Sequence, residues 1–169
     1  MLRPYTEFVQ DHKGRDRDEF LDVVKDPHLL VPGINRLEAP DDGGSFMTLR
    51  FKPGQAAREA DVLGIIGVRK RRDSNAFAMM ITLGRAPNND LVLPDQRVSK
   101  FHAYFRRVGA QWMINDANSM NGTWVDGAQV PPERSSPLKS GARIRLAETL
   151  ELVFLEPDQL YQRLRDAPA

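Results

Sequence analysis

The chain has 169 residues, of which 41% are hydrophobic and 28% are charged, and its formal net charge at pH 7 is +1. This length suits one compact domain with a short appendage, and the near-neutral charge gives no overall attraction to nucleic acid or to membranes. Because the chain has no cysteine and only three histidines, disulfides and thiolate chemistry are excluded, and we expect no metal site and no cofactor. No segment has the apolar character of a signal peptide or the ~20 apolar residues of a membrane span, so we expect a cytoplasmic protein.

Two short helices are predicted at the start of the chain. Apolar residues at helical spacing from Tyr5 predict a helix that ends near Gly14. A second helix is predicted over residues 16–25, where acidic residues precede an apolar stripe and a proline follows. Residues 32–60 are rich in proline and glycine, which predicts turns and short strands at most. We therefore expect residues 1–60 to form a helical and loop extension that packs on the core of the fold.

From residue 61 the chain changes to short apolar segments separated by turn signals. Residues 62–66 and 76–83 have strand length, and the charged segment 69–75 between them predicts a β-hairpin with a basic tip. Further strands are predicted at residues 91–93, 101–107, 111–115, 123–125, 143–146 and 150–154. Regularly spaced short strands predict an all-β fold, a two-sheet β-sandwich over residues 61–156. A short helix is predicted in residues 157–169, since proline suits a first helical turn and an apolar stripe follows it.

Three short polar segments lie at the ends of predicted strands. They are Gly84-Arg85, Ser99-Lys100-Phe101-His102 and Asn121-Gly122-Thr123. An arginine guanidinium presents a fixed fork of donors to phosphate oxygens, and a lysine adds a mobile positive charge. A serine can donate its hydroxyl and its backbone amide to a phosphate, and an asparagine amide can hold an extended backbone. Together these groups predict a clamp for a phosphorylated peptide.

Each segment alone also has a simpler interpretation. A Gly-Arg pair can end a strand, Ser-Lys can be a polar turn, and Asn-Gly is a turn signal. Ser99 and His102 could be a nucleophile and its base, but no third orienting group or oxyanion site is evident, so we expect no enzyme. The basic residues 69–72 could contact nucleic acid, although no aromatic residues are interleaved with them and a solvated turn is the commoner role.

Residues 81–154 resemble a forkhead-associated (FHA) domain, a β-sandwich that binds phosphothreonine peptides through loops at one end. The resemblance rests on motifs in the family's order: Ile81-Thr82-Leu83-Gly84-Arg85, Asn88-Asn89-Asp90-Leu91-Val92-Leu93, Val98-Ser99-Lys100-Phe101-His102-Ala103, Ser119-Met120-Asn121-Gly122-Thr123, and Leu138, Gly141 and Ile144. It implies that the phosphopeptide is bound by Arg85, Ser99, Lys100 and Asn121. It also implies that the site is supported by Gly84, His102, Gly122 and Thr123. The sequence departs from the family at Met120, because many members have a polar or basic residue there that reaches the phosphate.

The function that the resemblance implies is a phosphothreonine-binding adaptor in Ser/Thr kinase signalling, as in bacterial single-FHA proteins. Its partner would be a phosphorylated kinase or kinase substrate, with no nucleic acid and no membrane involved. Two alternatives remain: binding of nucleic acid or another anionic partner through residues 69–72, and a scaffold whose clamp no longer recognises phosphate. A narrower hypothesis is that Thr6, once phosphorylated, docks in the clamp of its own chain or of another copy.

Overall fold

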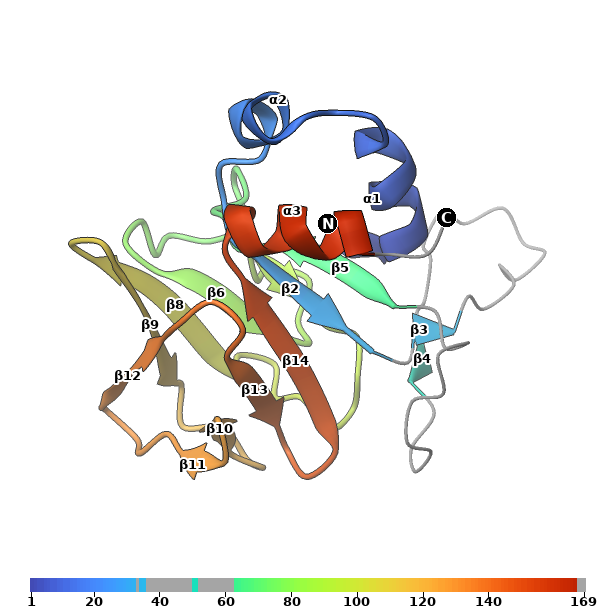
Figure 1. Ribbon diagram of the computed structural model, residues 1–169. Coiled ribbons are helices and arrows are strands. Elements are labelled where there is room, and N and C mark those ends of the chain that lie inside the picture. Colours follow the sequence, from blue (N-terminus) through green and yellow to red (C-terminus); the bar gives the residue numbers. More distant parts are fainter. Residues whose placement is uncertain (33, 36–49, 52–62, 167–169) are drawn as a thin grey trace.

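The computed structural model describes residues 1–32, 34–35, 50–51 and 63–166. Two β-sheets pack face to face, and three short helices lie beyond one of them (Figure 1). The larger sheet is antiparallel, in the order β1-β5-β2-β14-β13-β10-β11. Its strands are β1 (Arg3–Pro4), β5 (Gly64–Gly67), β2 (His28–Val31), β14 (Leu150–Leu155), β13 (Arg143–Leu146), β10 (Thr123–Val125) and β11 (Ala128–Gln129). The predicted two-sheet β-sandwich is confirmed.

The smaller sheet has five strands in the order β12-β9-β8-β6-β7, and in it only β6 and β7 run parallel. Its strands are β12 (Ser135–Leu138), β9 (Gln111–Asp116), β8 (Ala103–Val108), β6 (Ile81–Gly84) and β7 (Leu91–Val92). A separate pair joins β3 (Ile34–Asn35) to β4 (Arg50–Phe51). Most of residues 32–60, where turns were predicted, lie outside the described residues.

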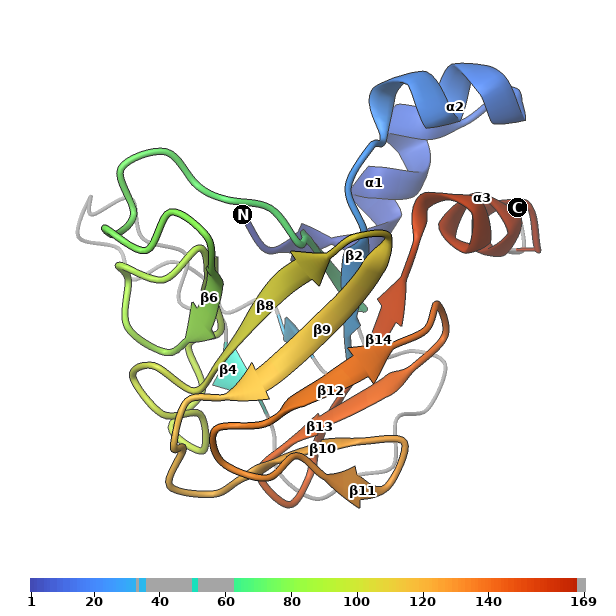
Figure 2. The same cartoon turned by 90° about the vertical axis from the view of Figure 1, so that its left-hand side faces the viewer.

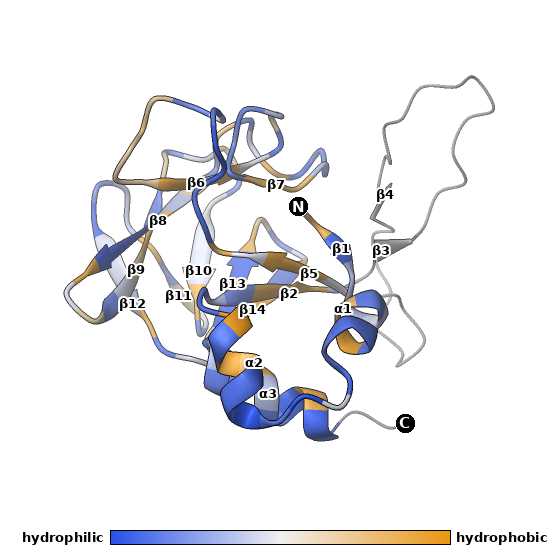
Figure 3. Cartoon of the chain, turned by 90° about the horizontal axis from the view of Figure 1, so that it is seen from above, coloured by the Kyte–Doolittle hydropathy of each residue, from blue (hydrophilic) through white to orange (hydrophobic). Residues whose placement is uncertain are grey.

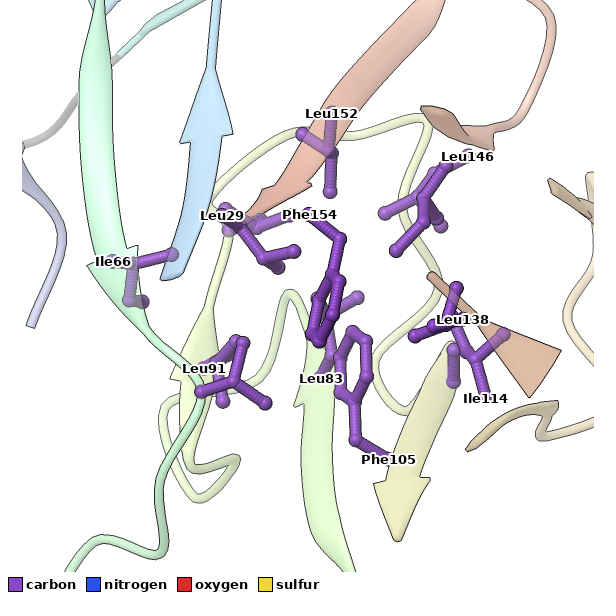
Figure 4. Close-up of a cluster of buried hydrophobic side chains, with 14 of the residues drawn as sticks. Leu29, Ile66, Leu83, Leu91, Phe105, Ile114, Leu138, Leu146, Leu152 and Phe154 are labelled. Carbon is purple, nitrogen blue, oxygen red and sulfur yellow. The ribbon is translucent and has the colours of Figure 1, made fainter. Parts of the chain in front are cut away.

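The hydrophobic core lies between the two sheets. Successive side chains of a strand point to opposite faces, so alternate residues of each strand enter it. Figure 4 shows side chains of both sheets meeting there, and those labelled are Leu29, Ile66, Leu83, Leu91, Phe105, Ile114, Leu138, Leu146, Leu152 and Phe154. Each fully buried side chain of this size contributes about 1.5–3 kcal/mol. The core therefore fixes the strand ends from which the loops described below emerge.

The helices α1 (Tyr5–His12), α2 (Arg17–Val23) and α3 (Pro157–Asp166) cover the outer face of the larger sheet (Figures 1 and 3). In β2, Leu29 packs in the core between the sheets, whereas Leu30 packs in the second cluster, under the helices. Figure 3 shows β2, β5, β6 and β7 as mainly hydrophobic, whereas the helices are mainly hydrophilic with isolated hydrophobic turns. None of the helices that the structure describes is long and apolar enough to cross a bilayer.

Local sequence explains where the helices begin, and all three predicted helices are confirmed. The Asp16 side chain accepts from the Glu19 amide at 2.9 Å, and the Glu19 side chain accepts from the Asp16 amide at 3.1 Å. This capping box satisfies two amides that lack partners within α2. Phe20 is fully buried beneath the helices, so the amphipathic stripe of α2 serves to anchor the extension on the sheet.

The strands β2 and β12 lie where the sequence predicted none. β2 pairs with both β5 and β14, so the sandwich includes residues before the predicted boundary at residue 61. β2 has only four residues, which directly follow Pro27. No turn residues mark its C-terminal boundary before Pro32, and it follows two predicted helices, so the local sequence did not indicate a strand. β12 pairs with β9 even though it contains Pro137. β12 is an edge strand, where a missing backbone donor is tolerated.

The predicted hairpin with a basic tip is wrong. β5 pairs with β1 and β2 in one sheet, whereas β6 pairs with β7 and β8 in the other. The chain therefore crosses from one sheet to the other through residues 68–80, and the strand predicted over 76–83 begins only at Ile81. Hydrophobic content alone did not reveal this crossing, since both strands are apolar and of similar length.

Candidate functional site

Three loops gather at the end of the sandwich where β6 and β9 finish and β8 begins, away from the helices (Figure 2). They comprise residues 85–90, 93–102 and 117–122. The first carries Arg85, the second Ser99 and Lys100, and the third Asn121. The structure thus brings the four predicted binding residues to one end of the molecule, while Thr6, in α1, lies at the helical end.

Arg85 is exposed, but its backbone amide and its Nε are hydrogen-bonded to the second loop. Its backbone amide donates to the carbonyl of Ser99 at 2.9 Å, and its Nε donates to the carbonyl of Val98 at 3.2 Å. Among the described residues neither Nη group has a protein partner. A guanidinium has five N–H donors, so four remain free at the mouth of the loops.

Ser99 joins the second loop to the third. Its amide donates to Nδ1 of His102 at 3.0 Å, and its Oγ accepts from the amide of Met120 at 3.0 Å. The amide was expected to donate to a phosphate, and that expectation is wrong because His102 already occupies it. The hydroxyl proton is still available, since Oγ acts only as an acceptor within the described structure.

His102 is completely buried between the same two loops. Because Nδ1 accepts from Ser99, Nε2 carries the proton and donates to the carbonyl of Gly122 at 3.0 Å. Burial lowers the pKa of His102, and the hydrogen bond to Gly122 opposes that shift. Both ring nitrogens face backbone groups, so the imidazole has no contact through which to activate the Ser99 hydroxyl. This geometry disfavours a nucleophile and base pair.

Asn121 and its neighbours are held by a buried carboxylate that the sequence analysis did not single out. Asp116 accepts from the Ser119 amide at 2.9 Å, from the Ser119 hydroxyl at 2.7 Å and from the Thr123 hydroxyl at 2.6 Å. Gly122 has φ of +84°, a conformation that glycine adopts readily. The Asn121 Nδ2 donates to the carbonyl of Arg97 at 2.9 Å, which leaves its Oδ1 free among the described residues. An Asp three residues before a Ser is a recognisable turn signal that could have identified Asp116.

Gly84 sits where the first and second loops touch. A Cβ added there would lie 2.3 Å from the Lys100 carbonyl oxygen and 2.9 Å from Nδ2 of Asn89. That amide nitrogen donates to the carbonyls of Ala86 at 2.9 Å and Lys100 at 2.6 Å. Asn89 had no assigned role, yet it is buried and ties the two loops together. Only a glycine allows the backbones to approach this closely.

Two residues of the basic segment 69–72 form contacts with the buried side chain of Asp90. The Lys70 ammonium lies 2.9 Å from Oδ2 of Asp90, and the Arg71 amide donates to Oδ1 at 2.9 Å. Burial raises the pKa of Asp90, but hydrogen bonds from Ser74, Thr82, Arg71 and Lys70 outweigh it and hold that pKa well below its usual range. The Arg71 guanidinium also donates to the carbonyl of Pro87. Half of the predicted basic cluster is therefore committed to holding a loop.

The remaining groups favour binding of an anion. Lys100 is exposed, and among the described residues its ammonium has no hydrogen bond or ion pair, whereas Arg97 is paired with Asp95 at 2.6 Å. Met120 is 90% exposed beside Asn121 and offers no donor. Within the described ranges, no three histidine or acidic side chains are grouped as a metal site requires. Unpaired donors on rigid loops suit a phosphate ester.

Known proteins resemble this chain. A family model described as the FHA domain matches residues 81–147. The chain is 31% identical over 148 residues to the glycogen accumulation regulator GarA of Mycolicibacterium smegmatis, covering 84% of this chain and 87% of that protein. It is 43% identical over 72 residues to an oxoglutarate dehydrogenase inhibitor of Corynebacterium jeikeium, covering 43% of this chain and 47% of the relative, so it spans about half of that relative's length. A solved structure of the N-terminal FHA domain of S. cerevisiae Rad53p with a phosphothreonine peptide matches with a TM-score of 0.46 and 24% identity, covering 59% of this chain and 89% of that chain.

Proposed function

We propose that this chain, which belongs to the FHA domain family, is a phosphothreonine-binding adaptor that docks phosphorylated partner proteins in Ser/Thr kinase signalling. In this proposal the phosphate is bound by Arg85, Ser99 and Lys100, while Asn121 holds the backbone of the peptide. The partner is a kinase or a kinase substrate, and the protein acts in the cytoplasm. It works by binding and has no catalytic step of its own, in keeping with relatives named as a regulator and an inhibitor.

The observation that carries the proposal is the set of donors at these loops that have no partner among the described residues. Within the part of the chain that the structure describes, the Arg85 Nη groups, the Ser99 hydroxyl proton and the Lys100 ammonium have no acceptor, and they lie on two neighbouring loops that hydrogen bonds to His102 and Asn89 hold in place. Donors that are fixed before the ligand arrives lose little conformational entropy on binding.

The expected hydrogen-bond energies agree with micromolar affinity for a phosphopeptide. A phosphate monoester carries about −1.5 to −2 charges at neutral pH, and each hydrogen bond to a charged group contributes about 1.5–3 kcal/mol. Three or four such bonds, less the cost of ordering a peptide, reach the ~8 kcal/mol of a micromolar complex. No covalent chemistry is needed to reach that value.

The test is a titration of the whole chain with a phosphothreonine peptide, its unphosphorylated form and a phosphoserine form. We expect binding only with phosphate, and a loss of at least tenfold in Arg85→Gln. Arg107→Gln is the matched control, because it removes the same charge from β8, where Arg107 lies over Trp112 at 6.0 Å. Equal affinity for the phosphorylated and unphosphorylated peptides, or equal losses in the two variants, would contradict the proposal.

A further inference from the structure

A surface strip of three aromatic side chains, Phe77, Phe101 and Tyr104, lies beside the clamp. The rings of Phe77 and Phe101 are stacked with centroids 6.0 Å apart, and those of Phe101 and Tyr104 are tilted with centroids 6.1 Å apart. Phe77 is 50% exposed, and Met79 in the same crossing loop is 86% exposed. Phe101 and Tyr104 are partly exposed. A group of large apolar side chains at a surface marks a contact site more often than an isolated one does.

The loop that carries Phe77 is held in place by hydrogen bonds of the Asn75 side chain. The Phe77 amide donates to Oδ1 of Asn75 at 3.1 Å, while Nδ2 of the same asparagine donates to the carbonyl of Asn88 at 3.0 Å. The Asn75 amide group also contacts Thr82 at 3.0 Å, next to the buried carboxylate of Asp90. The crossing loop is therefore attached to residues 85–90, the same loop that carries Arg85. Phe77 is thus held at the surface by a hydrogen-bonded frame.

The strip is continuous with the clamp through the backbone. Phe101 directly follows Lys100, so their Cα atoms are about 3.8 Å apart. The carbonyl of Lys100 accepts from the Ala86 amide at 3.1 Å, which holds this part of the second loop against the first. A bound segment in extended conformation advances roughly 3.3 Å per residue, so four residues span about 13 Å, and we take this as the range over which a flanking side chain contacts the strip.

We propose that the strip of Phe77, Phe101 and Tyr104 binds an apolar side chain of the same segment whose phosphothreonine occupies the clamp. This inference rests on the proposed function and adds to it the chemical class of the flanking residue. The strip is apolar and carries no charge, so it favours an aliphatic or aromatic side chain over an acidic or basic one. Fully buried aromatic side chains cover about 150–250 Å² each, which suits one or two ligand residues and falls short of the ~1,000 Å² of a stable dimer.

The experiment compares phosphothreonine peptides in which leucine or phenylalanine replaces alanine at each of the four positions on either side of the phosphothreonine. Affinities are measured by fluorescence anisotropy for the whole chain and for Phe77→Ser. Val108→Ser is the matched control, because Val108 is also an exposed apolar residue, at 54%, and lies at the opposite end of β8 from the clamp. Thermal unfolding of each variant establishes that it is folded.

We expect at least one flanking position at which the apolar peptide binds about five- to tenfold more tightly than its alanine counterpart, as partial burial of one side chain gives. Phe77→Ser should remove that preference and leave binding of the alanine peptide unchanged, while Val108→Ser keeps both. The inference is overturned if the wild-type chain shows no preference at any position, or if Phe77→Ser weakens all peptides equally. If binding depends on phosphate and on Arg85 but shows no apolar preference, the inference fails while the adaptor function stands. If no phosphopeptide binds, both fail.

Discussion

Gly84→Ala tests whether close contact between the first and second loops builds the clamp. The backbone at Gly84 does not have positive φ, so alanine is allowed there by its own conformation, and only the surrounding space opposes it. The added Cβ would lie 2.3 Å from the carbonyl oxygen of Lys100, about 1 Å closer than an ordinary contact of this kind. Either β6 or the Lys100 peptide must move.

The size of the effect follows from what that carbonyl holds. It accepts from the Ala86 amide at 3.1 Å and from Asn89 Nδ2 at 2.6 Å. Displacing it weakens two hydrogen bonds of about 0.5–1.5 kcal/mol each, and overpacking in a rigid site costs a further ~1–3 kcal/mol. We therefore expect the free energy of unfolding to fall by about 2–6 kcal/mol. Phosphopeptide affinity should fall at least tenfold, because Arg85 and Lys100 flank the displaced peptide.

Urea denaturation and peptide titration measure the two effects, with Gly67→Ala as the matched control. Gly67 also ends a strand without positive φ, but a Cβ there meets nothing closer than 3.4 Å, at Nε2 of His28. Its replacement should change the free energy of unfolding by less than about 1 kcal/mol and leave affinity intact. If Gly84→Ala behaves like Gly67→Ala, the two loops are not held by their close approach, and the argument for a preformed clamp is refuted.

Three further predictions concern the clamp, its supporting loop and acid stability. Met120→Arg should raise phosphopeptide affinity about three- to tenfold by placing a donor beside Asn121; an unchanged titration would mean that this position does not face the phosphate. Asp90→Asn should lower the free energy of unfolding by about 3 kcal/mol or more, because Lys70 loses its buried partner, and urea denaturation at pH 7 measures this; a change below about 1 kcal/mol would contradict it. Burial lowers the pKa of His28 from 6.5 to about 4, so the folded protein favours the neutral ring, and stability that is complete above pH 6.5 should fall by about 3 kcal/mol towards pH 4. Denaturation curves of His28→Asn should have a shallower dependence on pH in that window, and an unchanged slope would assign the acid sensitivity to other groups.

The sandwich was predictable because its strands are short, apolar and bounded by turns, and the terminal helices because their stripes and stops are local signals. β2 was not predictable in this way. Its four residues, at positions 28–31, become a strand because β5 and β14 offer hydrogen-bonding edges on both sides, and pairing between distant segments leaves little trace in local sequence. The crossing at residues 68–80 was missed for the same reason, since strand length says nothing about which sheet a strand joins.

In the candidate site, too, the residues whose role depends on residue type were predictable, and those whose role depends on contacts between distant segments were not. Arg85, Ser99 and Asn121 carry donor groups whose chemistry can be named from residue type alone. Asn89 and Asp116 act by holding backbone groups of other loops, and such a role exists only once the loops have been brought together. The Ser99 amide was assigned to the ligand because the sequence does not show that this amide donates to Nδ1 of His102 at 3.0 Å.

The donors left free at the clamp distinguish a phosphate from a carboxylate. Among the described residues, the Arg85 Nη groups, the Ser99 hydroxyl proton and the Lys100 ammonium have no acceptor within the protein. A phosphate monoester offers three oxygens in a tetrahedral arrangement and up to two negative charges, so each of these groups can find its own acceptor. A carboxylate offers two oxygens in one plane and a single charge, so it attracts the Arg85 and Lys100 cations less strongly than a phosphate does. The third oxygen and the larger charge of the phosphate ester therefore favour the modified residue over aspartate or glutamate at a site with two cationic side chains.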